Sequence, residues 1–102
     1  MELDAFTFVL LRRGPRAADY TEEELDEIQA GHLAYLDEMH RQGHLVLSGP
    51  FRDQEDETKR GFCLYRPGPE ETRSLTDQDP AVKAGRLAVE VMTWLTPKGA
   101  LG

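Results

Sequence analysis

The sequence TEEELDEIQAGHLAYLDEMHRQG, residues 21–43, predicts a long amphipathic helix that organises the rest of the chain. Thr21 and Glu24 are spaced as in a capping box, where each side chain accepts a hydrogen bond from a free backbone N–H at the helix start. Gly43 supplies the left-handed conformation that commonly ends a helix. Between these ends, apolar residues recur at steps of three and four and predict one buried face. That face also contains His32.

Four segments before and after this helix have the branched and aromatic composition of β-strands. We expect the second strand to end at Gly49-Pro50, because this dipeptide interrupts a strand, and residues 52–60 to form a charged hairpin loop. Weaker patterns predict a short helix over 70–75 and a proline-initiated helical turn over 80–84. The predicted strands cover residues 5–12, 44–48, 62–65 and 86–95.

The order of these segments predicts the fold. Strand, long helix, strand, strand, short helix, strand is the ferredoxin-like βαββαβ order, an α+β architecture with an antiparallel sheet and both helices on one face. A chain of 102 residues is long enough for one hydrophobic core but not for two. We therefore expect a single domain over residues 1–102.

The first strand is apolar on both faces, which has a consequence for assembly. Two helices cover only one face of a four-stranded sheet, so the other face would be a large exposed apolar patch on a monomer. A second copy packing against that face is the simplest cover, and we expect a homodimer or a higher homo-oligomer. The expected contact residues are Phe6, Phe8 and Leu10, or else Thr7, Val9 and Leu11.

Composition excludes several classes of partner. A net charge of −7 argues against binding to nucleic acid and to an anionic membrane surface, because both need a positive patch. The lone Cys63 cannot form an internal disulfide, which favours a reducing compartment. No secretion signal and no apolar segment of membrane-spanning length are recognisable. We therefore expect a cytoplasmic protein.

His32 and Asp79 are the first candidates for chemistry. A histidine on an apolar helix face is either a core residue bonded to nearby backbone or a general acid or base held by packing. Asp79 precedes Pro80 and either caps the following helical turn or orients an imidazole or acts as a base, and these roles do not exclude one another. The βαββαβ fold puts both residues on one side of the sheet. We expect a direct or one-water hydrogen bond between them, beside an open cavity.

Ser48 and the two other histidines give weaker signals. The Ser48 hydroxyl, at the end of the second strand, either bonds its own turn or holds a substrate oxygen. It lacks the Gly-x-Ser-x-Gly motif of serine hydrolases. His40 and His44 do not share one helix face with His32, and no motif such as His-Glu-x-x-His is present. We expect both to be exposed and predict no metal site.

Glu90 and Cys63 lie within predicted strands. By alternation, Glu90 lies on the apolar sheet face, where it is expected either to pair with an arginine across a dimer interface or to occupy a pocket that raises its pKa. Cys63 is expected to be a packing residue.

Several short motifs follow one another at particular spacings: His32-Leu33, Gly43-His44-Leu45, Ser48-Gly49-Pro50, Gly61, Asp79-Pro80, Ala84-Gly85 and Trp94. In this order the chain resembles the YCII-related family, over residues 5–96. The resemblance implies a ferredoxin-like dimeric α/β barrel. It also implies an active site built on the histidine of the first helix and the aspartate of the Asp-Pro motif, here His32 and Asp79.

The family includes a dehydrochlorinase of chlorinated-aromatic degradation, and its fold is similar to that of muconolactone isomerases. This chain has Asp-Pro-Ala at 79–81, where an aromatic residue often follows the proline, and that difference alters the expected pocket wall.

Two hypotheses for function follow. The first is a small YCII-like enzyme, a lyase of the dehydrochlorinase type or an isomerase, that transfers protons on a small cyclic or enolisable substrate without a cofactor. In it, His32 is the acid/base, Asp79 orients or assists it, and Ser48 contacts the substrate. The second is a non-catalytic dimeric module that binds a small molecule or serves as an accessory domain, with His32 and Asp79 in structural roles.

Overall fold

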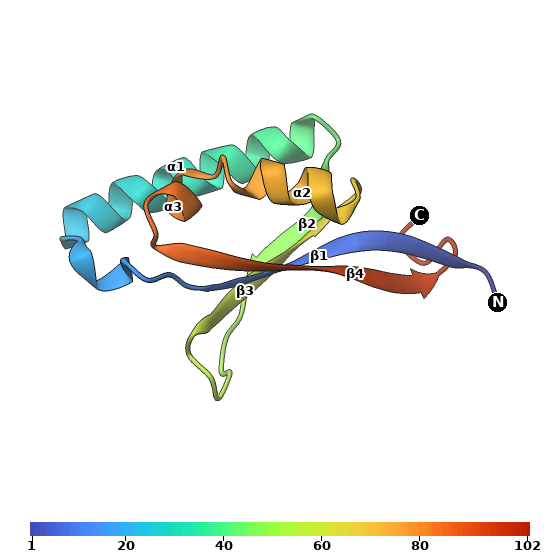
Figure 1. Cartoon of the computed structure of the whole chain (residues 1–102), viewed down its shortest axis with the longest axis horizontal. Helices are drawn as coiled ribbons and strands as arrows, with labels where there is room; N and C mark the ends of the chain where they lie inside the picture. Colours follow the sequence, from blue (N-terminus) through green and yellow to red (C-terminus); the bar gives the residue numbers. More distant parts are fainter.

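The computed structural model describes residues 1–102, and its elements follow in the predicted order (Figure 1). A short 3-10 helix, η1, precedes the long helix. The elements are β1 (Leu3–Arg13), η1 (Ala17–Asp19), α1 (Glu22–Arg41), β2 (Leu45–Pro50), β3 (Lys59–Tyr65), α2 (Pro69–Thr76), α3 (Pro80–Lys83) and β4 (Leu87–Pro97).

The four strands form one antiparallel sheet in the order β2-β3-β1-β4. The three α-helices lie on the same side of this sheet. The long helix α1 runs across the sheet, and α2 and α3 lie beside α1 (Figure 1). Strand order and one-sided helices are those of the ferredoxin-like α+β fold, so the predicted fold class is confirmed.

The ends of α1 are fixed by local interactions that the sequence predicted. The Thr21 side chain accepts from the Glu24 N–H, and the Glu24 carboxylate accepts from the Thr21 N–H, which completes the capping box. At the other end Gly43 has a φ of +83°. The Gly43 and His44 N–H groups donate to the carbonyls of His40 and Met39, as in a Schellman motif.

Several strands extend beyond their predicted bounds, and β2, which ends at Pro50, includes the Gly49-Pro50 dipeptide that was expected to interrupt it. Both residues belong to β2, and β4 likewise continues to Pro97. β2 and β4 are the two edge strands of the sheet. Proline lacks a backbone N–H, but an edge strand has one side on which no ladder hydrogen bond is lost.

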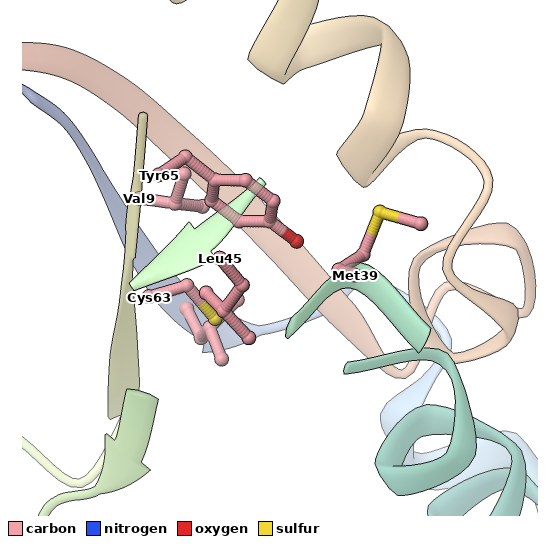
Figure 2. Packing of buried hydrophobic residues seen from close by; sticks show 6 residues of the cluster. Val9, Met39, Leu45, Cys63 and Tyr65 are labelled. Atoms are coloured by element: carbon pink, nitrogen blue, oxygen red, sulfur yellow. The ribbon is translucent and has the colours of Figure 1, made fainter. Parts of the chain in front are cut away.

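The core lies between the sheet and α1. It contains six buried side chains, and Figure 2 shows Tyr65, Val9, Leu45 and Cys63 gathered at the sheet with Met39 approaching from α1. Val9 is fully buried, and Cys63 and Tyr65 are almost so. Burial raises the pKa of the Tyr65 hydroxyl above its usual range, and it raises the pKa of the Cys63 thiol to about 12. Cys63 is thus the packing residue that was expected.

The opposite face of the sheet carries no helix. Thr7, Val9 and Leu11 are buried on the helix side of β1, which leaves Phe6, Phe8 and Leu10 on the open side. The Phe8 and Phe62 rings stack there with centroids 5.0 Å apart. Met92 and Trp94 of β4 remain 43% and 40% exposed. None of the helices combines the length and apolar character needed to cross a bilayer.

Candidate active site

His32 and Asp79 are joined by a hydrogen bond within the layer of helices. His32 Nδ1 lies 2.6 Å from Asp79 Oδ2, and the two side chains are only 8% and 4% exposed. The sequence placed these residues together through the fold, and the structure brings them into direct contact without an intervening water. Their role in catalysis stays a prediction.

A close approach of α3 to α1 makes this contact. Asp79 is the N-cap of α3, and its Oδ1 accepts from the Ala81 N–H at 2.9 Å while its Oδ2 faces His32. Gly31 precedes His32 on α1, and a Cβ there would lie 3.3 Å from the Pro80 ring. A side chain at position 31 would therefore make a tight contact with Pro80, which would have to shift by a few tenths of an ångström. Asp79 therefore serves both as a cap and as the partner of the imidazole.

The negative charge of Asp79 affects two other groups nearby, the partly buried Tyr35 and the buried Cys63. Burial, and secondly Asp79, raise the pKa of the Tyr35 hydroxyl. Burial also accounts for most of the raised pKa of the Cys63 thiol, and Asp79 adds to it. The Tyr35 hydroxyl donates to the Leu75 carbonyl at 2.6 Å, which ties α1 to α2. His32 is thus the direct hydrogen-bonding partner of a carboxylate that lies among neutral groups.

A cavity of about 460 Å³ opens beside His32. Leu33 and Leu36 of α1 line one wall, and Ser48 and Phe51 line another. Asp79 is not part of the lining, so it stands behind the histidine rather than in contact with the cavity. His32 Nδ1 is occupied by Asp79, which leaves Nε2 as the ring nitrogen that a bound molecule can use.

The structure also places Ser48 at this cavity, as the first hypothesis required. Ser48 lies on β2 opposite Cys63 of β3. In contrast to Cys63, Ser48 is exposed. A hydroxyl in this place can donate to or accept from a bound molecule.

The sequence reasoning missed three arginines that line the same cavity: Arg13, Arg60 and Arg86. They stand at the end of β1, near the start of β3 and just before β4. For Arg13 a signal existed, since it continues the inward alternation of Thr7, Val9 and Leu11. For Arg60 and Arg86 no local pattern indicated the cavity.

The other two histidines take no part in the site. His40 is exposed as expected, whereas His44 is half-buried, and neither lines the cavity. No group of three or more His, Cys, Asp or Glu side chains is placed to hold a metal ion.

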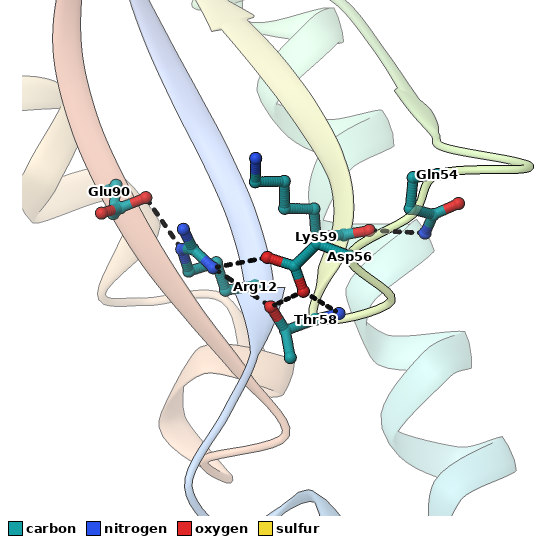
Figure 3. Close-up of polar contacts among 6 residues, drawn as sticks. All are labelled: Arg12, Gln54, Asp56, Thr58, Lys59 and Glu90. Carbon is teal, nitrogen blue, oxygen red and sulfur yellow. Dashed lines mark hydrogen bonds and ion pairs between the residues drawn. The ribbon is translucent and has the colours of Figure 1, made fainter.

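Glu90 does not lie in a pocket, and its arginine partner in the single chain is Arg12; a partner across a dimer interface stays a prediction. Glu90 is exposed on the open face of the sheet, and its Oε2 lies 2.9 Å from Arg12 Nε of the same chain (Figure 3). Arg12 follows Leu10, the residue opposite Glu90, by two positions on β1, so the pair is a diagonal contact between neighbouring strands.

Comparison with known proteins agrees with this fold. A sequence model of the YCII-related domain matches residues 6–95. None of the curated proteins compared matches significantly. Among solved structures, a similar one is 5-chloro-2-hydroxyhydroquinone dehydrochlorinase (TftG) from Burkholderia phenoliruptrix AC1100, in complex with 2,5-dihydroxybenzoquinone. The likeness has a TM-score of 0.55 and 22% sequence identity, and covers 94% of this chain and 96% of the dehydrochlorinase. The match over most of the sequence shows that the chain belongs to the YCII-related domain family.

Proposed function

We propose that this protein is a small-molecule enzyme that uses His32 as a general acid/base for elimination or isomerisation of a small cyclic or enolisable substrate. The observation that carries the proposal is the buried His32–Asp79 hydrogen bond of 2.6 Å beside a cavity of about 460 Å³. Substrate-sized cavities in proteins span about 300 to 1,000 Å³, so a small cyclic molecule fits this range.

Asp79 acts as the positioning residue in this proposal. An ionised carboxylate only accepts hydrogen bonds, so His32 Nδ1 carries the proton and donates it to Asp79 Oδ2. Nε2 then has a free electron pair with which it removes a proton from an activated C–H bond, or from a ring hydroxyl group of a hydroxyhydroquinone. In an isomerisation the imidazolium returns the proton to another atom, and in an elimination the neighbouring leaving group departs with its bonding electrons.

Ser48 is proposed to contact a substrate oxygen, because its residue lines the cavity with His32. The similar dehydrochlorinase supports the elimination branch, since its name gives a chlorinated hydroxyhydroquinone as its substrate. Loss of HCl from such a ring requires a proton acceptor, the role proposed here for His32.

The test uses 5-chloro-2-hydroxyhydroquinone as the first substrate, with chloride release as the readout, and a set of enolisable lactones whose C–H exchange is followed by proton NMR in D2O. The His32→Gln variant should lose activity by about 10²- to 10⁴-fold, the usual contribution of a positioned acid or base. His40→Gln is the matched control, because His40 is an exposed histidine on the same helix and lies outside the cavity. Equal activity of His32→Gln and the parent protein would contradict the proposal.

The second candidate is a non-catalytic binding or accessory module. One observation favours it: Asp79 caps α3 and binds His32, so both residues have a structural role without any substrate. A folded protein that binds the compounds of the same set, but turns over none of them, would favour this module.

We also propose that the protein acts in the cytoplasm as a homodimer. The cytoplasmic location is supported by the free, buried thiol of Cys63, which has no partner for a disulfide. The dimer is supported by the open sheet face around Phe8 and Trp94.

A further inference from the structure

Positive charge is concentrated in the cavity beside His32. Arg13, Arg60 and Arg86 line this cavity, and no aspartate or glutamate does. The chain as a whole has 19 acidic residues against 12 basic ones. Its composition would put acidic side chains in such a place more often than basic ones, so the cationic lining is a local feature.

The backbone brings two of these arginines together at one end of the sheet. Arg13 ends β1 and pairs with Leu87, the first residue of β4. The next residue, Gly14, donates its N–H to the Arg86 carbonyl at 2.7 Å. A Cβ at Gly14 would lie 2.2 Å from the Gly85 carbonyl oxygen, so only glycine permits this close approach.

Arg60 lies at the same end of the sheet, at an irregularity in β3. Leu11 pairs with Gly61, and the next residue, Arg12, pairs with Lys59. Arg60 is therefore the extra residue of a β-bulge. Such bulges change the direction of a side chain and are frequent beside active sites.

The charge of Arg13 is not neutralised within the protein, in contrast to that of its neighbour. Arg12 is paired with Glu90 and with Asp56, and it also donates to Thr58 (Figure 3). Arg12 is on the open face of the sheet, where both of its acidic partners lie close to it. Arg13, on the helix side, has no ion pair.

Arg60 and Arg86 likewise make no ion pair. Arg86 also borders a shallow depression next to Glu22 and Asp26, but neither carboxylate bonds it. Three arginines that line one cavity without an ion pair make its surroundings positive, which favours the binding of an anion.

The rest of the cavity wall is apolar in several places. Leu11, Leu36 and Leu87 contribute to it from β1, α1 and β4. A ligand that satisfies both parts of the wall carries an anionic group and a carbon skeleton.

We propose that the ligand of this cavity is a small carboxylate with an apolar skeleton, whose carboxylate group is bound by Arg13, Arg60 and Arg86. The forked guanidinium group matches the two oxygens of a carboxylate in bidentate hydrogen bonds. The inference rests on the proposed function in one respect, namely that this ligand is the substrate on which His32 acts.

The test compares pairs of compounds that differ only in charge. Benzoate and cyclohexanecarboxylate are titrated calorimetrically into the full chain, beside benzamide and cyclohexanecarboxamide. Inorganic phosphate serves as an anion without a carbon skeleton. We expect saturable binding of a carboxylate. The corresponding amide should bind at least about tenfold more weakly, because a hydrogen bond to a charged group contributes about 1.5–3 kcal/mol.

Substitutions assign this preference to the arginines. Arg13→Gln and Arg60→Gln should each weaken benzoate binding about tenfold or more. Arg73→Gln is the matched control, because Arg73 is an unpaired, exposed arginine on α2 that does not line the cavity. In the parent protein, benzoate should shift the side-chain Nε–Hε NMR signals of Arg13 and Arg60, a readout that does not depend on how well a variant folds.

The outcomes separate this inference from the proposed function. The inference would be overturned if no carboxylate bound, or if acid and amide bound with equal affinity. It would also be overturned if Arg73→Gln weakened benzoate binding as much as Arg13→Gln and Arg60→Gln do. Phosphate binding as tight as benzoate binding would overturn the carboxylate assignment. His32→Gln should keep benzoate binding while it loses proton transfer. Binding without turnover by the parent protein refutes only the proposed function, and turnover of neutral substrates alone refutes only this inference.

Discussion

The hydrogen bond between His32 and Asp79 determines which imidazole nitrogen is available for chemistry. Replacing Asp79 by asparagine removes the carboxylate but keeps the size of the side chain. We expect the parent protein to hold His32 as the Nδ1–H tautomer, and Asp79→Asn to lose this fixed preference, because the Asn amide can donate as well as accept. Nitrogen-15 NMR of the imidazole measures the tautomer directly. The same tautomer in both proteins would show that Asp79 does not position the histidine.

Cys63 gives a second prediction for a single residue. Burial raises the pKa of its thiol from an ordinary 9.0 to about 12, so the folded thiol stays neutral where the unfolded one ionises. Its contribution to stability is present below pH 9 and is lost as the pH rises toward 12. The free energy of unfolding should therefore fall above pH 9, and the thiol contributes at most about 1.4 kcal/mol per pH unit to that fall. Denaturant titrations at several pH values should show that the free energy of unfolding falls less steeply with pH in Cys63→Ala than in the parent protein. The same slope in both proteins would contradict this role of the thiol.

Residues of the candidate site differ in how far the sequence could predict them. His32 and Asp79 could be named because each stands at a recognisable place, on an apolar helix face and before a proline. Arg13 could have been found from the alternation of β1, but Arg60 and Arg86 could not, because Arg60 lies at a bulge of β3 and Arg86 follows the close approach of Gly14 to Gly85. Both features depend on strand register, which no short stretch of sequence contains.

For whole elements, the ends of α1 were predictable and those of the strands were not. Capping is local, and Thr21 and Gly43 are recognised from their immediate neighbours. Whether Gly49-Pro50 ends a strand depends on its position in the sheet. The dipeptide continues β2 because β2 is an edge strand, and edge position follows from the order of all four strands.

The capping box at the start of α1 can be tested separately. Thr21→Ala removes the side-chain acceptor for the Glu24 N–H and should lower the free energy of unfolding by about 1 kcal/mol. Thr21→Ser keeps the hydroxyl and should cost much less, which makes it the control. Chemical denaturation of the three proteins measures the difference, and equal stability of Thr21→Ala and the parent would show that the cap contributes nothing.

For the whole molecule, the uncovered sheet face gives a prediction of oligomeric state. Sedimentation at micromolar concentration should give twice the mass of the chain. Met92→Asp should reduce this to one chain, because it puts a charge on an exposed apolar position of the open face. Leu101→Asp, at an exposed apolar position outside the sheet, is the control. A monomeric parent protein would contradict the dimer.

The longest ladder of the sheet joins the first strand to the last. β1 and β4 pair from Leu3 opposite Pro97 to Arg13 opposite Leu87, across most of the sequence. Bringing such distant segments together costs more loop-closure entropy than a hairpin does, and folds rich in distant contacts fold slowly. During synthesis on the ribosome, β1 must therefore keep one unpaired edge until β4 has emerged. The edge of β1 is open to pairing with other chains for the whole of that interval, so the sheet is most prone to aggregate before β4 has been translated.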